Sequence, residues 1–166
     1  MYQGYHNQPS AAQLRFSSKL ELPVFTNTGV PLSIVSKDFW RIQCQYGSCE
    51  FDPVTRHNIP IWEHAIGQKL GQRTIFLDRI SVVTEMREQG IADALMAKAM
   101  KIVDDLNFSI ITYITPFDRS TNFERLVELF SRFGFQLIYE NRECVGREHA
   151  AMYRPQSTQF RLTNTD

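Results

Sequence analysis

The sequence predicts an α/β fold in which a mixed sheet is flanked by helices, and three observations lead to this prediction. Residues 74–83 form a β-branched, apolar run of strand length. A helix-period segment follows it directly, and strand-like and helix-like segments then alternate to residue 153. With 166 residues, 43% of them hydrophobic, the chain is long enough for one full core. Alternating strands and helices predict a mixed sheet with right-handed crossovers.

We expect a single domain over residues 18–155. Residues 1–17 are rich in Gln, Asn and Ser and show no period, which predicts a polar N-terminal arm. Residues 156–166 are also polar and predict a C-terminal tail.

The first 70 residues of the chain carry weaker patterns. Asn27-Thr28-Gly29 is typical of a hairpin turn, and Trp40, Ile42 and Cys44 alternate on one face of a strand. A short helix is predicted after Asn58 as the cap, with Gly71 ending it. In order, we expect strands at 20–25, 30–35 and 39–46, a turn-rich segment at 49–58 and a helix at 60–70.

The later elements are better defined. Thr121 and Glu124 fit a capping box, Gly134 fits a helix C-cap, and Glu128 and Arg132 are spaced as an i,i+4 ion pair. The expected apolar stripes are Ile91, Leu95, Ala99, Ile102 and Leu106 in one helix, and Phe123, Leu126, Val127, Phe130 and Phe133 in the other. We expect strands at 74–83, 109–114, 136–141 and 147–153, and helices at 90–106 and 122–133.

A strand, a glycine-containing turn and a helix N-terminus follow one another around Gly90. The first N–H groups of a helix lack intrahelical partners, and the helix dipole adds partial positive charge there. Such a terminus binds phosphate oxygens well. The turn is neither a P-loop nor a dinucleotide fingerprint, because the required Lys-Ser or Lys-Thr and the additional glycines are missing.

The turn reads R-x-x-G-x-A from Arg87 to Ala92. It resembles the pyrophosphate loop of the GCN5-related N-acetyltransferases, the GNAT superfamily, which lies between a strand and a helix. A second stretch is similar to the superfamily's other signature, with Asn122 and Phe130 in the helix and Gly134-Phe135 after it. The two stretches cover about half of the chain. The resemblance implies a mostly antiparallel central sheet, although the first 70 residues do not match the usual opening strand and helices.

The resemblance also implies that acetyl-CoA is the cofactor. Asn122 and Phe130 would flank its pantetheine arm, and Arg87 would add charge at the pyrophosphate. Glu88 is unusual beside a pyrophosphate, so its side chain is expected to face solvent. The ordinary alternatives are a plain strand-to-helix turn at Gly90 and simple core packing of Phe130. The implied pyrophosphate loop consists of Arg87, Glu88, Gln89, Gly90, Ile91 and Ala92, and the strand paired with pantetheine contains Ile80, Val82 and Val83.

The catalytic groups are harder to assign. Many GNAT enzymes carry a Tyr that protonates the leaving thiolate, and this chain has Phe130 at that position. Candidate substitutes, which could equally be packed aromatic residues, are Tyr113, Tyr139 and Tyr153. Asp78 is the first candidate base, because its apolar neighbours on the strand would raise its pKa. Glu85 is the second candidate. The alternative for Asp78 is an ion pair with a neighbouring strand.

The expected activity is therefore direct transfer of an acetyl group from acetyl-CoA to an amine of a small molecule or a protein, with strand N–H groups holding the oxyanion. A catalytically silent GNAT-fold binding or structural module is the alternative. The missing Tyr, the polar ends and the atypical first half favour that alternative. A nucleobase acceptor is a third option, which a net charge of +0 disfavours. A homodimer is left open.

The composition excludes several other classes. The chain has no apolar run near the ~20 residues of a membrane span and no apolar signal core. Cys44, Cys49 and Cys144 form no C-x-x-C pair, and His57 and His64 lack metal-ligand spacing. We therefore expect no metal site, no disulfide framework and a cytoplasmic location.

Overall fold

The computed structural model describes residues 24–38, 40–116, 122–142 and 148–157. The N-terminal arm predicted at 1–17 lies outside the described residues, as do Thr121, Cys144 and all but the first two residues of the predicted C-terminal tail. Among the helices of the described part, none is long and apolar enough to cross a membrane. Within the same ranges, no group of three or more His, Cys, Asp or Glu side chains could hold a metal ion.

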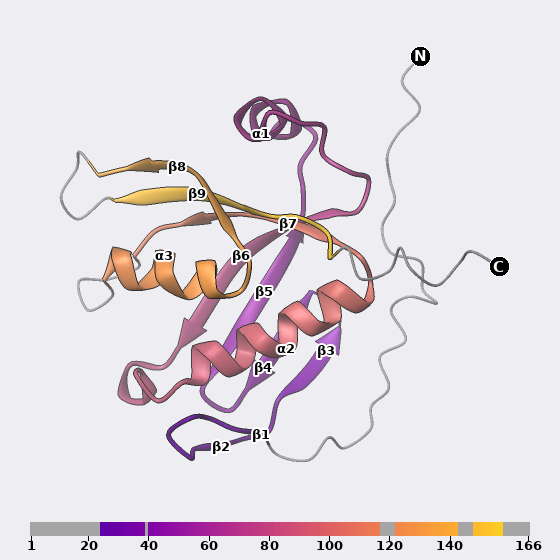
Figure 1. Cartoon of the computed structure of the whole chain (residues 1–166). Coiled ribbons are helices and arrows are strands. Elements are labelled where there is room, and N and C mark those ends of the chain that lie inside the picture. Colours follow the sequence, from indigo (N-terminus) through magenta and orange to yellow (C-terminus); the bar gives the residue numbers. More distant parts are fainter. Residues whose placement is uncertain (1–23, 39, 117–121, 143–147, 158–166) are drawn as a thin grey trace.

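A seven-stranded sheet forms the centre of the molecule (Figure 1), in the order β3-β4-β5-β6-β7-β9-β8. Neighbouring strands are antiparallel except for β6 and β7, which are parallel. The predicted fold class, a mixed and mostly antiparallel sheet flanked by helices, is confirmed. The strands are β3 (Val35–Asp38), β4 (Arg41–Cys44), β5 (Gly47–Pro53), β6 (Thr74–Val82), β7 (Ser109–Ile114), β8 (Gln136–Asn141) and β9 (His149–Arg154).

Helices cover both faces of this sheet. Helix α1 (Ile59–Ile66) packs Trp62 against Ile111 and Tyr153 on one face. Helices α2 (Ile91–Asp105) and α3 (Phe123–Arg132) cover the other face, where the larger core includes Ile110. Because successive strand residues point to opposite faces, Ile110 and Ile111 of β7 serve different cores. In Figure 1, α2 and α3 lie on the same side of the sheet and α1 lies apart from them.

The two long helices follow the predicted apolar stripes. In α2, Ile91, Leu95 and Ala99 are buried as expected, and Met96, Met100 and Val103 widen the buried face. Ile102 and Leu106 are half-buried at the edge of the core. In α3, the buried positions are Phe123, Leu129 and Phe130.

The ends of α3 differ in part from the prediction. The N-cap is Asn122, whose Oδ1 accepts a hydrogen bond from the Arg125 N–H at 3.1 Å, so the cap lies one residue after Thr121. Gly134 follows the helix with a φ of 84°, as a residue just after a helix end often does. Arg132 forms its ion pair with Asp93 of α2 rather than with Glu128.

The first part of the chain is where the predictions fail most. The turn at Asn27-Thr28-Gly29 is confirmed, and among the described residues it joins the strands β1 (Val24–Phe25) and β2 (Pro31–Leu32). Residues 20–23 of the predicted strand 20–25 lie outside the described residues. The prediction of a turn-rich segment at 49–58 is wrong, because β5 occupies the first half of that segment and pairs with both β4 and β6. Helix α1 ends at Gly67, in the left-handed region with a φ of 76°, and not at Gly71.

Candidate functional site

The strand that leads to the predicted loop contains a β-bulge. Arg79 of β6 is opposite Glu50 of β5, and Leu77 is opposite Phe51, so Asp78 is the extra residue on β6. A bulge bends its strand and increases the local twist. Next to it, the pairing of β6 with β7 stops after Phe76 and Ile111. The two parallel strands therefore separate just where the bulge lies.

Thr112 marks the point at which the strands part. Its buried hydroxyl donates a hydrogen bond to the carbonyl of Leu77 at 2.8 Å, in place of a backbone bond between the strands. Beyond it, the edge of β6 from Asp78 to Val82 faces a gap instead of a neighbouring strand. An exposed strand edge can pair with an extended ligand.

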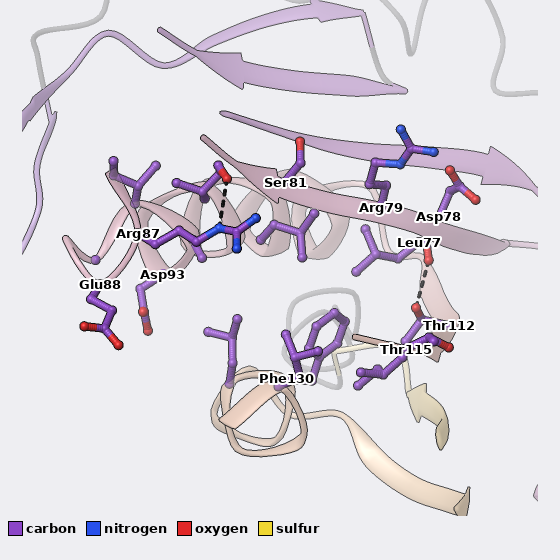
Figure 2. Close-up of a pocket in the computed structure, with 18 of the residues that line it drawn as sticks. Leu77, Asp78, Arg79, Ser81, Arg87, Glu88, Asp93, Thr112, Thr115 and Phe130 are labelled. Atoms are coloured by element: carbon purple, nitrogen blue, oxygen red, sulfur yellow. Dashed lines mark hydrogen bonds between the residues drawn. The ribbon is translucent and has the colours of Figure 1, made fainter. Parts of the chain in front are cut away.

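The gap is part of a cavity of about 480 Å³. Figure 2 shows it below β6, with the loop after β6 at one end, Thr112 and Thr115 at the other, and Phe130 of α3 on the opposite wall. The cavity is lined by Leu77, Asp78, Arg79, Ile80, Ser81, Val82, Met86, Arg87, Glu88, Gly90, Ile91, Ala92, Asp93, Thr112, Tyr113, Ile114, Thr115, Leu126, Leu129 and Phe130.

The loop end of the cavity has the geometry of an anion site. A short 3₁₀ turn, η1 (Thr84–Met86), leads into the loop, and Gly90 caps α2 with a φ of 73°. The N–H of Ala94 makes the first intrahelical bond, to the carbonyl of Gly90 at 3.1 Å. The N–H groups of Ile91, Ala92 and Asp93 precede that bond, where donors have no carbonyl of their own helix to reach. The positive end of the helix dipole lies at the same place.

The hairpin β1-β2 supports this loop from outside the cavity. The hydroxyl of Thr28 donates a hydrogen bond to the carbonyl of Gln89 at 2.9 Å. The side chain of Asn27 lies against Gly90, in the space that a Cβ atom would occupy. Gly90 is therefore required both by its positive φ and by the hairpin packed against it.

Charged side chains around the loop decide whether a phosphate could be held there. Glu88 and Asp93 line the cavity and carry negative charge, but each is paired with an arginine of α3. Arg87 also lines the cavity, and its Nε donates to the carbonyl of Val82 at 3.4 Å. The two ion pairs neutralise Glu88 and Asp93, so that Arg87 and the positive end of the helix dipole remain on the cavity side of the loop. These residues thus fit a phosphate group.

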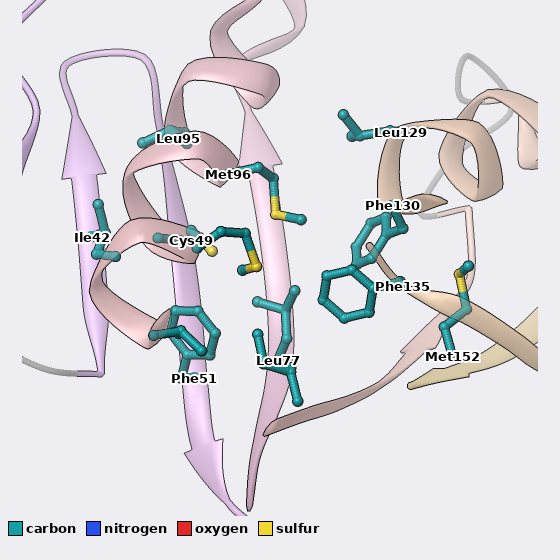
Figure 3. Packing of buried hydrophobic residues seen from close by; sticks show 14 of the residues in the cluster. Ile42, Cys49, Phe51, Leu77, Leu95, Met96, Leu129, Phe130, Phe135 and Met152 are labelled. Atoms are coloured by element: carbon teal, nitrogen blue, oxygen red, sulfur yellow. The ribbon is translucent and has the colours of Figure 1, made fainter. Parts of the chain in front are cut away.

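The wall opposite β6 is apolar. Phe130 is 4% exposed, and its ring meets that of Phe135 edge-on, with 5.2 Å between the centroids. Figure 3 shows the two rings facing the sheet from the α3 side. Leu126 and Leu129 extend this wall. Phe130 is thus both a core residue and a lining residue, which joins the two alternatives left open by the sequence.

The surroundings predicted for Asp78 are wrong. Alternation from Phe76 would place Asp78 between apolar neighbours, but the bulge shifts the phase of β6, and Asp78 is exposed at the rim of the cavity. After the bulge, Ile80 and Val82 are the residues that pack on the larger core. Glu85 lies in η1, is exposed, and does not line the cavity.

The cavity gathers most of the remaining predicted site residues. Ile80, Val82, Arg87, Glu88, Gly90, Ile91, Ala92 and Phe130 line it together with Asp78. Val83, Gln89 and Asn122 do not. Gln89 contacts the hairpin, and Asn122 caps α3.

Several lining residues were not predicted. Ser81, Thr112 and Thr115 carry no motif, and only the separation of β6 from β7 brings them to one cavity. Tyr113, weighed above as an acid, lies against Trp62 and Phe76, with ring centroids 4.8 Å and 6.1 Å away. From the sequence, the hydrophobic neighbours of Tyr113 predict a packed aromatic side chain. Tyr113 borders the gap because the pairing of β6 with β7 stops two residues earlier, at Ile111.

Beside the cavity, Ser81 begins a chain of polar contacts across the sheet. Its hydroxyl is 3.2 Å from that of Ser48 on β5, and Ser48 donates to Glu50 at 2.9 Å. Arg41 of β4 pairs with the same carboxylate at 2.9 Å. Ser48 is buried, whereas Ser81 is exposed on the cavity wall.

Comparisons with known proteins give matches among solved structures alone. No protein-family model matches the sequence, and no curated protein matches it either. A histone acetyltransferase HPA2 and related acetyltransferase from Corynebacterium glutamicum is 15% identical with a TM-score of 0.47, over 80% of this chain and 66% of the other. The ribosomal-protein-S18-alanine N-acetyltransferase from Escherichia coli is 13% identical with a TM-score of 0.49, over 75% and 72% of the two chains. A spermidine N-acetyltransferase chimera that includes the Vibrio cholerae protein is 16% identical with a TM-score of 0.47, over 70% and 66%.

These solved structures are named as acetyltransferases.

Proposed function

We propose that the chain binds acetyl-CoA in the cavity beside β6 and transfers the acetyl group to an amine. One observation carries the proposal. The gap that the Asp78 bulge opens between β6 and β7 leads along β6 to the N-terminus of α2. An extended ligand with a diphosphate at one end matches this combination of strand edge and helix terminus.

Different parts of the cavity serve different parts of the ligand. The first-turn N–H groups of α2 and the Arg87 side chain hold the diphosphate. The backbone edge of β6 pairs with the amide-containing pantetheine arm, in the manner of an added strand. The apolar wall that includes Leu129 and Phe130 covers the other side of the arm and keeps water away from it.

When bound, acetyl-CoA supplies an activated acetyl thioester. The chain contributes N–H groups of β6 that can donate to the acetyl carbonyl oxygen while the amine forms the C–N bond. The C–S bond would then break, and the CoA thiolate would leave and take up a proton from water. The exposed carboxylate of Asp78, at the rim, accepts a proton from the incoming ammonium group. Glu85 is exposed in η1 and does not line the cavity, which makes it the weaker candidate.

The acceptor is an amine of a small molecule or of a protein. A homodimer and a cytoplasmic location also remain predictions from the sequence.

The proposal is tested by calorimetric titration with acetyl-CoA, followed by mass spectrometry of a panel of small amines and peptides incubated with the protein and acetyl-CoA. We expect saturable binding and a mass increase of one acetyl group on at least one amine. Absence of binding at millimolar acetyl-CoA would overturn the cofactor assignment.

A second function, a catalytically silent binding module, is favoured by one specific feature. Phe130 fills the position at which many GNAT enzymes carry a proton donor, and it is buried against Phe135. Such a module would bind acetyl-CoA or CoA but acetylate no amine in the panel. The two functions are thus separated by turnover, and not by binding.

A further inference from the structure

Two carboxylates lie at the end of the cavity that should hold phosphates. Glu88 is in the loop and Asp93 is in the first turn of α2, and both line the cavity (Figure 2). A carboxylate close to a phosphate raises the free energy of the bound state, because like charges repel. The presence of two carboxylates in a site for a diphosphate therefore requires an explanation.

Each carboxylate is paired with an arginine, and both arginines belong to α3. Arg125 Nη1 is 2.7 Å from Glu88 Oε1, and Arg132 Nη2 is 2.7 Å from Asp93 Oδ1. The two arginines are seven residues apart, so they lie on one side of α3, two turns from each other. They extend from α3 to the loop and to the start of α2, beside the residues that line the cavity.

We propose that Arg125 and Arg132 are phosphate-binding residues, and that Glu88 and Asp93 hold them in the free protein in place of the phosphates. This assignment rests on the proposed function. On binding, the arginines exchange their carboxylate partners for phosphate oxygens, and the freed carboxylates turn to solvent. Glu88 and Asp93 thereby lower the affinity of the site while keeping the arginines positioned over it.

The exposure of the pairs makes this exchange inexpensive. The Arg125 and Glu88 side chains are 73% and 77% exposed, and those of Arg132 and Asp93 are 57% and 44% exposed. Ion pairs this open to water contribute little, since solvent screens them. A guanidinium makes two parallel hydrogen bonds to phosphate as readily as to carboxylate, and the diphosphate offers two negative charges to the two arginines.

The alternative is that the two pairs clamp α3 over the cavity. The two accounts predict opposite signs for the acidic residues. If Glu88 competes with phosphate, then Glu88→Gln tightens CoA binding; if Glu88 clamps α3, then Glu88→Gln weakens it. They also differ in the part of the ligand affected, because a clamp acts on every ligand and competition acts on phosphates alone.

The experiment is calorimetric titration of the wild type, Glu88→Gln, Arg125→Gln, Asp93→Asn and Arg132→Gln with two probes, CoA and pantetheine, which lacks the phosphates. Asp105→Asn is the matched control, since Asp105 forms an exposed ion pair with Lys101 at 3.1 Å at the far end of α2. We expect the arginine variants to weaken CoA binding ~5–10-fold and the acidic variants to tighten it ~2–5-fold, in line with exposed charge-assisted hydrogen bonds. Pantetheine binding and the control should stay unchanged.

Weaker CoA binding in the acidic variants, unchanged binding in all four, or an equal effect on pantetheine would overturn the assignment. If neither the wild type nor Glu88→Gln binds CoA, the proposed function fails, and the assignment fails with it. If the arginine variants and the acidic variants change the affinity for CoA in the same direction, in a protein that binds CoA, the assignment is overturned and the proposed function stands.

Discussion

Replacing Gly90 with Ala tests the loop and its contact with the hairpin β1-β2. Gly90 has a φ of 73°, a backbone conformation that costs a residue with a Cβ about 1–2 kcal/mol. A Cβ at position 90 would also meet the side chain of Asn27 and lie 3.4 Å from Cβ of Thr26. Moving Asn27 away from its rotamer adds ~0.5–1.5 kcal/mol.

Gly67→Ala is the matched control. Gly67 has a similar φ of 76°, and a Cβ there would meet nothing within 4 Å. Gly67→Ala should therefore lower the free energy of unfolding only by the cost of the left-handed backbone, about 1–2 kcal/mol. For a chain of this size that corresponds to a fall in Tm of roughly 2–8 °C, and Gly90→Ala should fall further.

The assay is urea denaturation and thermal melting of the single variants Gly90→Ala, Gly67→Ala and Asn27→Ala and of the double variant Gly90→Ala/Asn27→Ala. The double variant, corrected for Asn27→Ala alone, should return to the level of Gly67→Ala, because the collision is gone and the backbone cost remains. If Gly90→Ala costs no more than Gly67→Ala, the hairpin does not pack on the loop as described.

Four further substitutions test the site and the packing around it. Asp78→Asn should lower kcat and leave Tm unchanged, because the side chain is exposed; normal turnover would remove Asp78 as the proton acceptor. Phe130→Tyr should lower stability by ~1–3 kcal/mol without faster acetyl transfer, since a hydroxyl buried beside Phe135 lacks a partner; a rate gain at full stability would contradict this. Asp104→Asn should cost ~1.5–3 kcal/mol in urea denaturation, because Arg154 binds both its carboxylate oxygens, at 2.7 and 2.9 Å, from a mostly buried position. Arg154→Lys should be similarly destabilised, as Lys lacks the planar fork, and a loss under ~0.5 kcal/mol for either would refute the buried pair.

Periodic segments with clear ends could be predicted from the sequence. The boundaries of β7 agree with the prediction, and those of α2 differ by one residue at each end, because apolar spacing and a glycine turn define them. Strand β5 could not be predicted in the same way. Its polar and apolar residues alternate over few positions before Asp52-Pro53, a pair that is typical of a turn.

In the candidate site too, local features could be predicted from the sequence, and features that depend on strand pairing could not. The loop around Gly90 follows from a local motif, whereas the environment of Asp78 depends on a bulge that is defined by pairing with β5. A bulge shifts every later side chain of its strand to the other face, and the sequence of one strand does not reveal it. The arginines that approach Glu88 and Asp93 come from α3, more than thirty residues away along the chain.

The polar contacts behind the cavity wall have a fixed direction. Ser48 has a single hydroxyl proton, and the carboxylate of Glu50 can only accept, so that proton points to Glu50. Ser48 must then accept from Ser81 in the 3.2 Å contact between them. Ser81 in turn has no proton left for another acceptor, and its hydroxyl, which points away from the Phe130 side of β6 (Figure 2), presents only lone pairs there. A group with protons to donate, such as an ammonium, is therefore matched on that side of β6, and a carbonyl oxygen is not.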